Sequence, residues 1–254
     1  MDGYGGDQIR AAERPHLDAG EPLMQRAADG LAAIVGALLD DPAERPGDGP
    51  GTVLLLVGSG DNGGDALFAG ARLATAGRTV EVVRVGSRVH EAGLAAALEA
   101  GCSLLGEPSG PGTGASGAAD VLRAAATSDA DRLAAVTTEA ALRADLVLDG
   151  ILGIGVSGPS ALRSPARECV HAIRELARDQ RAPFVVAVDV PSGIDVDTGG
   201  IADDHVLHAD VTVTFGGVKA GLLRGPAATL AGRIELVDVG IAADLAAVEP
   251  LIRT

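Results

Sequence analysis

The chain has 254 residues, a length that suits one domain at the upper end of the usual range or two small ones. Hydrophobic residues make up 47% of it and aromatic residues only 2%, so the core must be aliphatic, which suits a parallel sheet covered by helices. The net charge of −15 at pH 7 excludes a general nucleic-acid binder, although backbone N–H groups at a helix start can still hold an anionic ligand.

The residues that most often bind metals or form disulfides are sparse. Cys102 and Cys169 form no CxxC pair, and we expect two buried thiols in a reducing compartment. His205 and His208 lie three residues apart with no further ligands nearby, so we interpret them as ordinary histidines. No apolar run approaches the roughly 20 residues of a membrane span and no signal pattern opens the chain. We therefore expect a cytoplasmic protein with no membrane partner.

The first 40 residues predict a helical arm. Apolar residues recur at helical spacing over residues 7–40, with a turn around Gly20-Glu21-Pro22. A polar loop rich in proline and glycine follows at residues 40–51 and separates this arm, residues 1–40, from the remainder. The apolar stripe of the arm is compatible with a homodimer interface.

From residue 52 onward, apolar runs alternate with helical patterns. Strands are predicted at 52–58, 79–86, 102–106, 145–153, 183–193, 209–217 and 232–240, and helices at 63–77, 90–101 and 164–179. Residues 107–117 are of low complexity and predict a surface loop. This alternation predicts a parallel sheet covered on both faces, in one domain over residues 1–254 with its α/β core at residues 52–241.

The first strand of such a sheet ends in a glycine-rich loop, at the edge where ligands bind. Gly58, Gly60 and Gly63 fit a G-x-G-x-x-G pattern, which lets the backbone approach a ligand and exposes N–H donors at the helix start. The alternative is a tight turn in which Asp65 stabilises the start of the helix. Asn62, the only asparagine, can coordinate a cation through its side-chain oxygen, or can take up left-handed turn geometry.

Later strand ends carry further polar groups. Asp149 ends an apolar run, where a carboxylate needs solvent, a partner or a cation, unless it is a cap or turn residue. Asp189 ends another, with Ser192 in the following turn, and is a candidate acid or base or else bonds the turn amides. Lys219 is the only lysine among 20 lysine and arginine residues, which indicates a need for a compact ammonium group or is a solvated surface lysine.

Four segments, taken in order, resemble one family. They are VGSGDNGGDALFAGARL (57–73), DLVLDGILGIGVSG (145–158), VVAVDVPSGIDVDTG (185–199) and VTVTFGGVKAGLL (211–223). Together with the opening stretch 9–35 they are similar to the YjeF N-terminal family, the NAD(P)H-hydrate epimerases, and the likeness runs from about residue 7 to residue 241. The resemblance implies a Rossmann-like three-layer α/β/α sandwich with a mostly parallel central sheet.

The resemblance also implies an isomerase that interconverts the R and S epimers of hydrated NADH and NADPH, a repair activity. Substrate contacts are then expected from Asp61, Asn62, Gly63, Gly64 and Asp65, and from Gly153, Ile154, Gly155, Val156, Ser157, Gly158 and Pro159. One potassium ion per subunit is expected at Asn62, Asp149 and Ser192, a set of oxygen donors that suits a hard cation rather than zinc. Asp189 is expected near the reacting carbon.

The hydrated ring of the substrate carries a hydroxyl on a carbon next to nitrogen, and the two epimers differ at this carbon. Loss of that hydroxyl, or opening of the ring there, flattens the carbon, and addition from the other face inverts it. Either route needs a group that takes and returns a proton, which we assign to Asp189, with Lys219 as a second catalytic candidate. A dehydratase partner, encoded separately, is compatible with the resemblance.

Three positions depart from the family pattern. Asp61 replaces the usual first asparagine, Ala66 replaces a glycine, and Gly150 follows Asp149 where an aromatic residue is common. Asp61 adds negative charge beside a ligand that carries phosphate. A non-catalytic nucleotide-binding domain of the same fold therefore stays open as an alternative.

An NAD(P)-dependent dehydrogenase is the other alternative. Such enzymes place an acid at the end of the second strand to hold the ribose. Here Glu81 lies inside that strand, and its end carries Arg84 and Arg88 instead, which disfavours this function.

Overall fold

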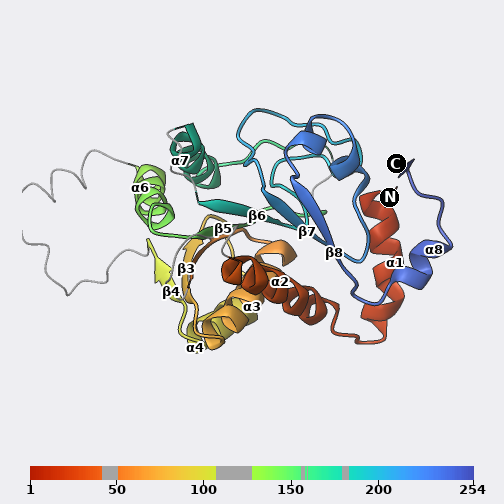
Figure 1. Cartoon of the computed structure of the whole chain (residues 1–254), viewed down its shortest axis with the longest axis horizontal. Helices are drawn as coiled ribbons and strands as arrows, with labels where there is room; N and C mark the ends of the chain where they lie inside the picture. The colour runs from red at the N-terminus through yellow and green to blue at the C-terminus, as the bar shows by residue number, and fades with distance from the viewer. Residues whose placement is uncertain (42–50, 107–127, 156–157, 159, 179–182) are drawn as a thin grey trace, which may run out of the picture.

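A computed structural model describes residues 1–41, 51–106, 128–155, 158, 160–178 and 183–254 (Figure 1). Its centre is a sheet of seven strands in the order β4-β3-β2-β5-β6-β7-β8, in which every neighbouring pair is parallel. The strands are β2 (Thr52–Val57), β3 (Thr79–Arg84), β4 (Ser103–Leu105), β5 (Leu146–Gly150), β6 (Phe184–Val188), β7 (Val211–Phe215) and β8 (Arg233–Val237). The direction of strand addition reverses between β2 and β5, which makes the carboxyl ends of these two strands the place where a ligand is expected.

Helices cover both faces of the sheet and form three layers. One face carries α2 (Leu23–Asp40), α3 (Asp61–Thr75) and α4 (Glu91–Glu99), and the other carries α6 (Asp129–Ala141) and α7 (Ala166–Arg178) (Figure 1). Side chains of β2 alternate between the two layers, because Leu55 packs into the first core and Leu54 and Leu56 into the second. The predicted α/β/α sandwich is thus confirmed.

The two ends of the described chain lie together. β1 (Asp2–Gly3) pairs antiparallel with β9 (Ile252–Arg253), and α1 (Gly6–Asp18) lies beside α8 (Ala242–Ala246) at the same end of the molecule (Figure 1). Two short 3₁₀ helices, η1 (Ala220–Leu223) and η2 (Pro226–Thr229), follow β7. Next to β1, the Tyr4 backbone donates to the Val218 carbonyl and accepts from the Ala220 amide, each at 2.8 Å. The start of the chain therefore holds the segment around Lys219.

The predicted strands all form, but most end earlier than expected. The run predicted at 145–153 stops as a strand at Gly150, because residues 151–155 turn away from the sheet. The helix predicted from residue 63 begins two residues earlier, at Asp61. Helix α6 was not predicted, and the loop predicted at 107–117 lies outside the described residues.

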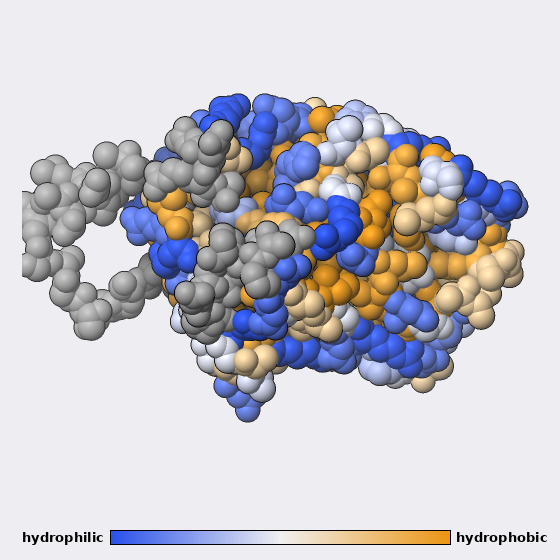
Figure 2. Space-filling view, in the orientation of Figure 1, coloured by the Kyte–Doolittle hydropathy of each residue, from blue (hydrophilic) through white to orange (hydrophobic). Residues whose placement is uncertain are grey.

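The buried and exposed residues can be compared with what the composition predicted. Cys102 and Cys169 are both buried free thiols, as expected. Apolar residues form an area near the middle of the face in Figure 2, and polar residues surround it. None of the helices described here combines the length and the apolarity that a membrane crossing requires.

Candidate functional site

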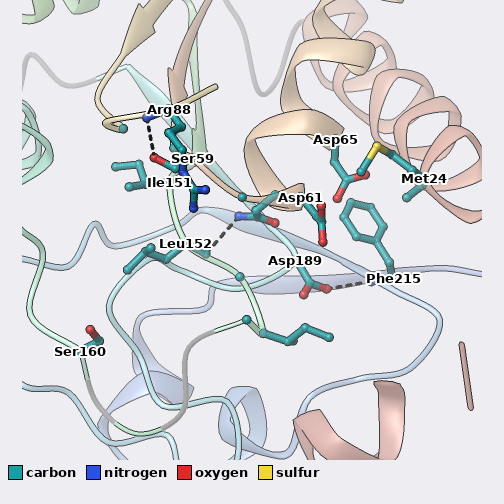
Figure 3. Close-up of a pocket in the computed structure, with 18 of the residues that line it drawn as sticks. Met24, Ser59, Asp61, Asp65, Arg88, Ile151, Leu152, Ser160, Asp189 and Phe215 are labelled. Carbon is teal, nitrogen blue, oxygen red and sulfur yellow. Dashed lines mark hydrogen bonds between the residues drawn. The ribbon is translucent and has the colours of Figure 1, made fainter. Parts of the chain in front are cut away.

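A pocket of about 1100 Å³ opens at the carboxyl ends of the strands. Its wall includes residues that follow β2, β3, β5, β6 and β7, and it is completed by α1 and α2 (Figure 3). It therefore covers the point where the strand order reverses, and its volume is at the upper end for small-molecule sites. Size and position suit an elongated ligand.

The glycine-rich loop after β2 forms one part of this wall. A Cβ on Gly58 would overlap the carbonyl of Ile151, and one on Gly63 would overlap the carbonyl of Gly58, so these two glycines are required for packing. A Cβ on Gly60 would meet nothing within 4 Å. Only the middle glycine leaves open space for a ligand, next to the first N–H groups of α3.

A buried carboxylate lies behind the pocket wall at the end of β5. Asp149 is fully buried and accepts hydrogen bonds from the Ser192 amide at 2.9 Å and the Ser192 hydroxyl at 2.6 Å. Burial raises the pKa of Asp149, and the hydrogen bonds from Ser192 and Ile151 oppose that shift. Within the described chain its hydrogen-bond partners are all neutral groups. The register explains the burial, because Asp149 lies opposite Leu56 in the middle of the sheet.

Asn62 and Ser192 converge on one backbone carbonyl beside Asp149. The Asn62 amide donates to the Leu152 oxygen at 3.0 Å, and the Ser192 hydroxyl lies 3.3 Å from the same oxygen. The Leu152 amide in turn donates to the Ser192 hydroxyl at 2.9 Å. Amide, hydroxyl, carbonyl and carboxylate oxygens are the donors that a hard cation prefers, and the uncompensated carboxylate fits one. These residues could therefore hold a cation.

Asp189 and Lys219 form a buried ion pair on the other side of the pocket. The Lys219 ammonium donates to Asp189 Oδ1, and to the Phe215 carbonyl at 2.8 Å. Lys219 is only 1% exposed, so the alternative of a solvated surface lysine is wrong. Asp189 Oδ1 also accepts from the Thr214 hydroxyl and the Phe215 amide, each at 3.2 Å. The backbone of Asp189 is left-handed, with φ of 66°, which is strained for a residue other than glycine and recurs at functional sites.

Further carboxylates surround this ion pair. Burial raises the pKa of Asp65 well above its usual value, and the charges of Asp189 and Asp61 add to the shift. Burial also raises the pKa of Glu13, which Lys219 opposes and Asp189 reinforces. Figure 3 shows Asp61, Asp65 and Asp189 gathered around one part of the pocket. The raised pKa makes Asp65 a candidate proton donor, whereas the Asp189 carboxylate is held by the Lys219 ammonium.

Helix α1 supplies a wall of the pocket that sequence reasoning missed. Arg10 donates to the Ile154 carbonyl at 2.5 Å and so ties α1 to the loop that follows β5. Glu13, Arg14 and Leu17 also face the pocket. The signal was present in the sequence, because positions 10, 13, 14 and 17 share one helical face. The arm thus completes the pocket, a role that the sequence-based interpretation did not assign to it.

The structure places the predicted site residues in three groups. Those that line the pocket are Asp61, Asn62, Asp65, Gly153, Ile154, Gly155, Asp189 and Lys219. Gly63, Gly64, Asp149 and Ser192 are buried behind its wall. Gly158 lies near Asp195, to which its amide donates, and Val156, Ser157 and Pro159 lie outside the described residues.

One group outside the pocket has metal-ligand chemistry. Asp203, Asp204 and His205 place three possible ligand atoms within 4.8 Å of one another. Both carboxylates already pair with arginines, since Asp203 lies 3.3 Å from Arg167 and Asp204 lies 3.4 Å from Arg174. The interpretation of His205 as an ordinary histidine stays a prediction.

Fold and pocket together define the class: a Rossmann-like α/β protein with a small-molecule site at its strand ends. Residues 20–221 match the family described as YjeF-related protein N-terminus, and the chain belongs to that family.

Curated relatives extend over nearly the whole chain. A protein of Clavibacter michiganensis subsp. michiganensis named NAD(P)H-hydrate epimerase is 46% identical over 252 residues, which cover 99% of this chain and 95% of the relative. A protein of that name from Microbacterium testaceum is 45% identical over 94% of this chain and 78% of its own. The Bifunctional NAD(P)H-hydrate repair enzyme Nnr of Mycobacterium tuberculosis is 40% identical over 94% of this chain and 41% of its own.

A solved structure shows the same fold. The crystal structure of yeast YNU0 (YNL200c) has a TM-score of 0.64 and 18% identity, and the match covers 87% of this chain and 83% of that one. At this identity the likeness supports the fold.

Proposed function

We propose that this protein interconverts the R and S epimers of hydrated NADH and hydrated NADPH, the reaction named in its nearly full-length relatives. The observation that carries the proposal is a buried ion pair, Asp189 with Lys219, beside a carboxyl with a raised pKa, Asp65, in one pocket of dinucleotide size. A carboxyl with a raised pKa beside a carboxylate that is paired with an ammonium group provides a candidate acid and a candidate base for one reaction.

Asp65 and Asp189 divide the proton transfers between them. Asp65 gives its proton to the hydroxyl of the hydrated ring, the carbon–oxygen bond breaks, and water leaves while the ring nitrogen shares its electron pair with the flat carbon. Water then adds to the opposite face, a new carbon–oxygen bond forms, and Asp189 accepts the proton released. Solvent in the pocket returns that proton to Asp65. The two carboxyls come from α3 and from the end of β6, so they reach the pocket from different elements (Figure 3).

Lys219 holds the base in place. Its ammonium and the Phe215 amide both bind Oδ1 of Asp189, which fixes the carboxylate orientation in spite of its strained backbone. Arg10 fixes the loop after β5 through the Ile154 carbonyl. Lys219 and Arg10 therefore act as positioning residues: Lys219 orients the Asp189 carboxylate, and Arg10 orients the loop after β5, beside the hydrated ring of the substrate.

Asn62, Asp149 and Ser192 would hold one potassium ion per subunit. The support is the fully buried Asp149 carboxylate with neutral partners and the oxygen donors around the Leu152 carbonyl. A potassium ion bound there would position substrate oxygens and offset phosphate charge.

Two further parts of the proposal concern partners. A dehydratase acting on the same damaged cofactor is the partner activity, supported by the bifunctional name of the Mycobacterium tuberculosis relative, of which this chain matches 41%. We also propose a homodimer. The apolar stripe of the arm does not provide its interface, because Ile9, Leu23 and Leu31 are buried in the protein's own core; the support is Leu236, 51% exposed on the edge strand β8. Sedimentation of the purified protein tests the dimer.

The test of function follows one purified epimer of hydrated NADH over time by chromatography. Wild type is expected to produce the other epimer far faster than the spontaneous reaction, and Asp189→Asn to lose at least a hundredfold in rate while keeping its fold. Asp204→Asn is the matched control, because that carboxylate is 74% exposed and lies outside the pocket. Binding of nucleotide without epimerisation by wild type would favour the non-catalytic alternative, and hydride transfer on intact cofactor would favour a dehydrogenase.

A further inference from the structure

We propose that Arg88 binds the 2′-phosphate of the substrate adenosine, so that the protein prefers hydrated NADPH to hydrated NADH. This inference rests on the proposed function, since it concerns which cofactor form enters the same pocket. The residues that support it lie after β3, at the end of the pocket away from Asp189 and Lys219.

The loop after β3 is held against the glycine-rich loop. The amides of Val85 and Gly86 donate to the Val57 carbonyl at 2.9 and 3.2 Å, and the Arg88 amide donates to the Ser59 hydroxyl at 3.1 Å (Figure 3). These bonds fix the backbone of Arg88 beside the pocket, which its exposed side chain helps to line. The guanidinium is thus presented from a fixed position.

The order of the strands assigns a role to that position. From β4 through β3, β2, β5 and β6 to β7, the sheet has the strand order of dinucleotide-binding Rossmann sheets. In those sheets the end of the strand corresponding to β3 reads the adenosine ribose: an acid there binds the 2′-hydroxyl, and an arginine accommodates a 2′-phosphate. Residues 84–90 contain no acid, and Glu81, inside β3, pairs with Arg143 at 2.8 Å. The missing acid, which disfavours a dehydrogenase that binds the ribose 2′-hydroxyl, leaves at this position an arginine that suits a 2′-phosphate.

The distribution of charge in the pocket indicates which end of the dinucleotide lies near Lys219 and which lies near β3. Asp61 and Asp189 lie at the Lys219 end of the pocket, where their negative charge would repel phosphate (Figure 3). Strands β3 and β6, which Arg88 and Asp189 follow, are three spacings apart, roughly 14 Å at the usual distance between parallel strands. A dinucleotide with its hydrated ring at Asp189 can place its adenosine near β3, where a guanidinium offers paired hydrogen bonds to phosphate.

The experiment measures kcat/KM for hydrated NADPH and hydrated NADH with wild type and Arg88→Gln. Wild type is expected to favour hydrated NADPH at least tenfold, and Arg88→Gln to bring that ratio near one by raising KM for hydrated NADPH only. Arg178→Gln, an exposed arginine on α7 outside the pocket, is the control and should change neither value. A wild-type ratio near one, or an equal loss on both substrates with Arg88→Gln, would overturn the proposal, the latter because it would place Arg88 on a group common to both.

A binding measurement separates this inference from the proposed function. Adenosine 2′,5′-bisphosphate should bind wild type at least tenfold more tightly than adenosine 5′-monophosphate, and Arg88→Gln should remove the difference. If wild type binds in this way but epimerises neither substrate, the proposed function fails and the phosphate site stands. If wild type epimerises both substrates and binds the two probes equally, the phosphate site fails alone.

Discussion

Replacing Lys219 with methionine should destabilise the protein and abolish its reaction. Methionine fills much of the same volume but leaves Asp189 Oδ1 without its cation and removes one of the two donors to the Phe215 carbonyl, which keeps the Gly217 amide at 2.7 Å. Breaking a buried ion pair by removing one partner costs about 3–5 kcal/mol. Asp189 lines a pocket that water can enter, so we expect the lower figure, about 3 kcal/mol, which lowers Tm by roughly 6–12 °C in a chain of this length.

The assay is a double-mutant cycle by urea and thermal unfolding. Lys219→Met and Asp189→Asn each leave a buried group without its partner, whereas the double variant leaves no charge at either position. We expect the double variant to be more stable than the sum of the single effects predicts, by about 2 kcal/mol or more. Single effects that add to within about 0.5 kcal/mol, or a Lys219→Met protein as stable as wild type, would show that the ion pair does not hold this part of the fold.

The remaining predictions concern packing and pH. Gly63→Ala should lower the unfolding free energy by about 2 kcal/mol or more, because its Cβ would overlap a backbone carbonyl, whereas Gly60→Ala should leave stability near wild type; equal urea midpoints for both would contradict this. His16 lies 2.9 Å from both Glu21 and Asp244, and those hydrogen bonds raise its pKa. Because the folded pKa lies above the unfolded one, the stabilisation is present below about pH 6.5 and is lost as pH rises through the folded value. The Tm deficit of His16→Gln should therefore be larger at pH 5.5 than at pH 9, and a deficit independent of pH would argue against it.

The layers of the fold could be predicted because each strand is a short aliphatic run with a helix-like segment after it. The run at 52–58 can be recognised as a strand from its own residues, because β2 is buried on both faces and is therefore continuously apolar. Helix α6 shows the limit: only Thr137, Ala140 and Ala141 are buried in it, and its first turn is acidic, so no apolar stripe marks it. Where a helix contributes little to the core, periodicity gives little signal.

The part of the site that could be predicted lies at the strand ends, which a parallel sheet brings to one edge. Asn62 and Ser192 come after β2 and β6, Asp149 lies near the end of β5, and the sheet order places β5 between those two strands. The contribution of α1 could not be predicted in this way, because it precedes the first core strand and its position depends on packing against distant elements. The burial of Lys219 depends likewise on Asp189, thirty residues away. A local pattern cannot specify such a pairing.

The left-handed backbone of Asp189 makes this position informative about evolutionary history. Holding an aspartate there costs about 1 kcal/mol or more, a strain that glycine avoids and asparagine tolerates better. A descendant chain released from the reaction would gain stability by drifting to either residue once Lys219 is also replaced by an uncharged residue, because Lys219 would otherwise stay buried without its partner. The residue found at this position therefore distinguishes chains still under selection for proton transfer from those that have kept only the shape.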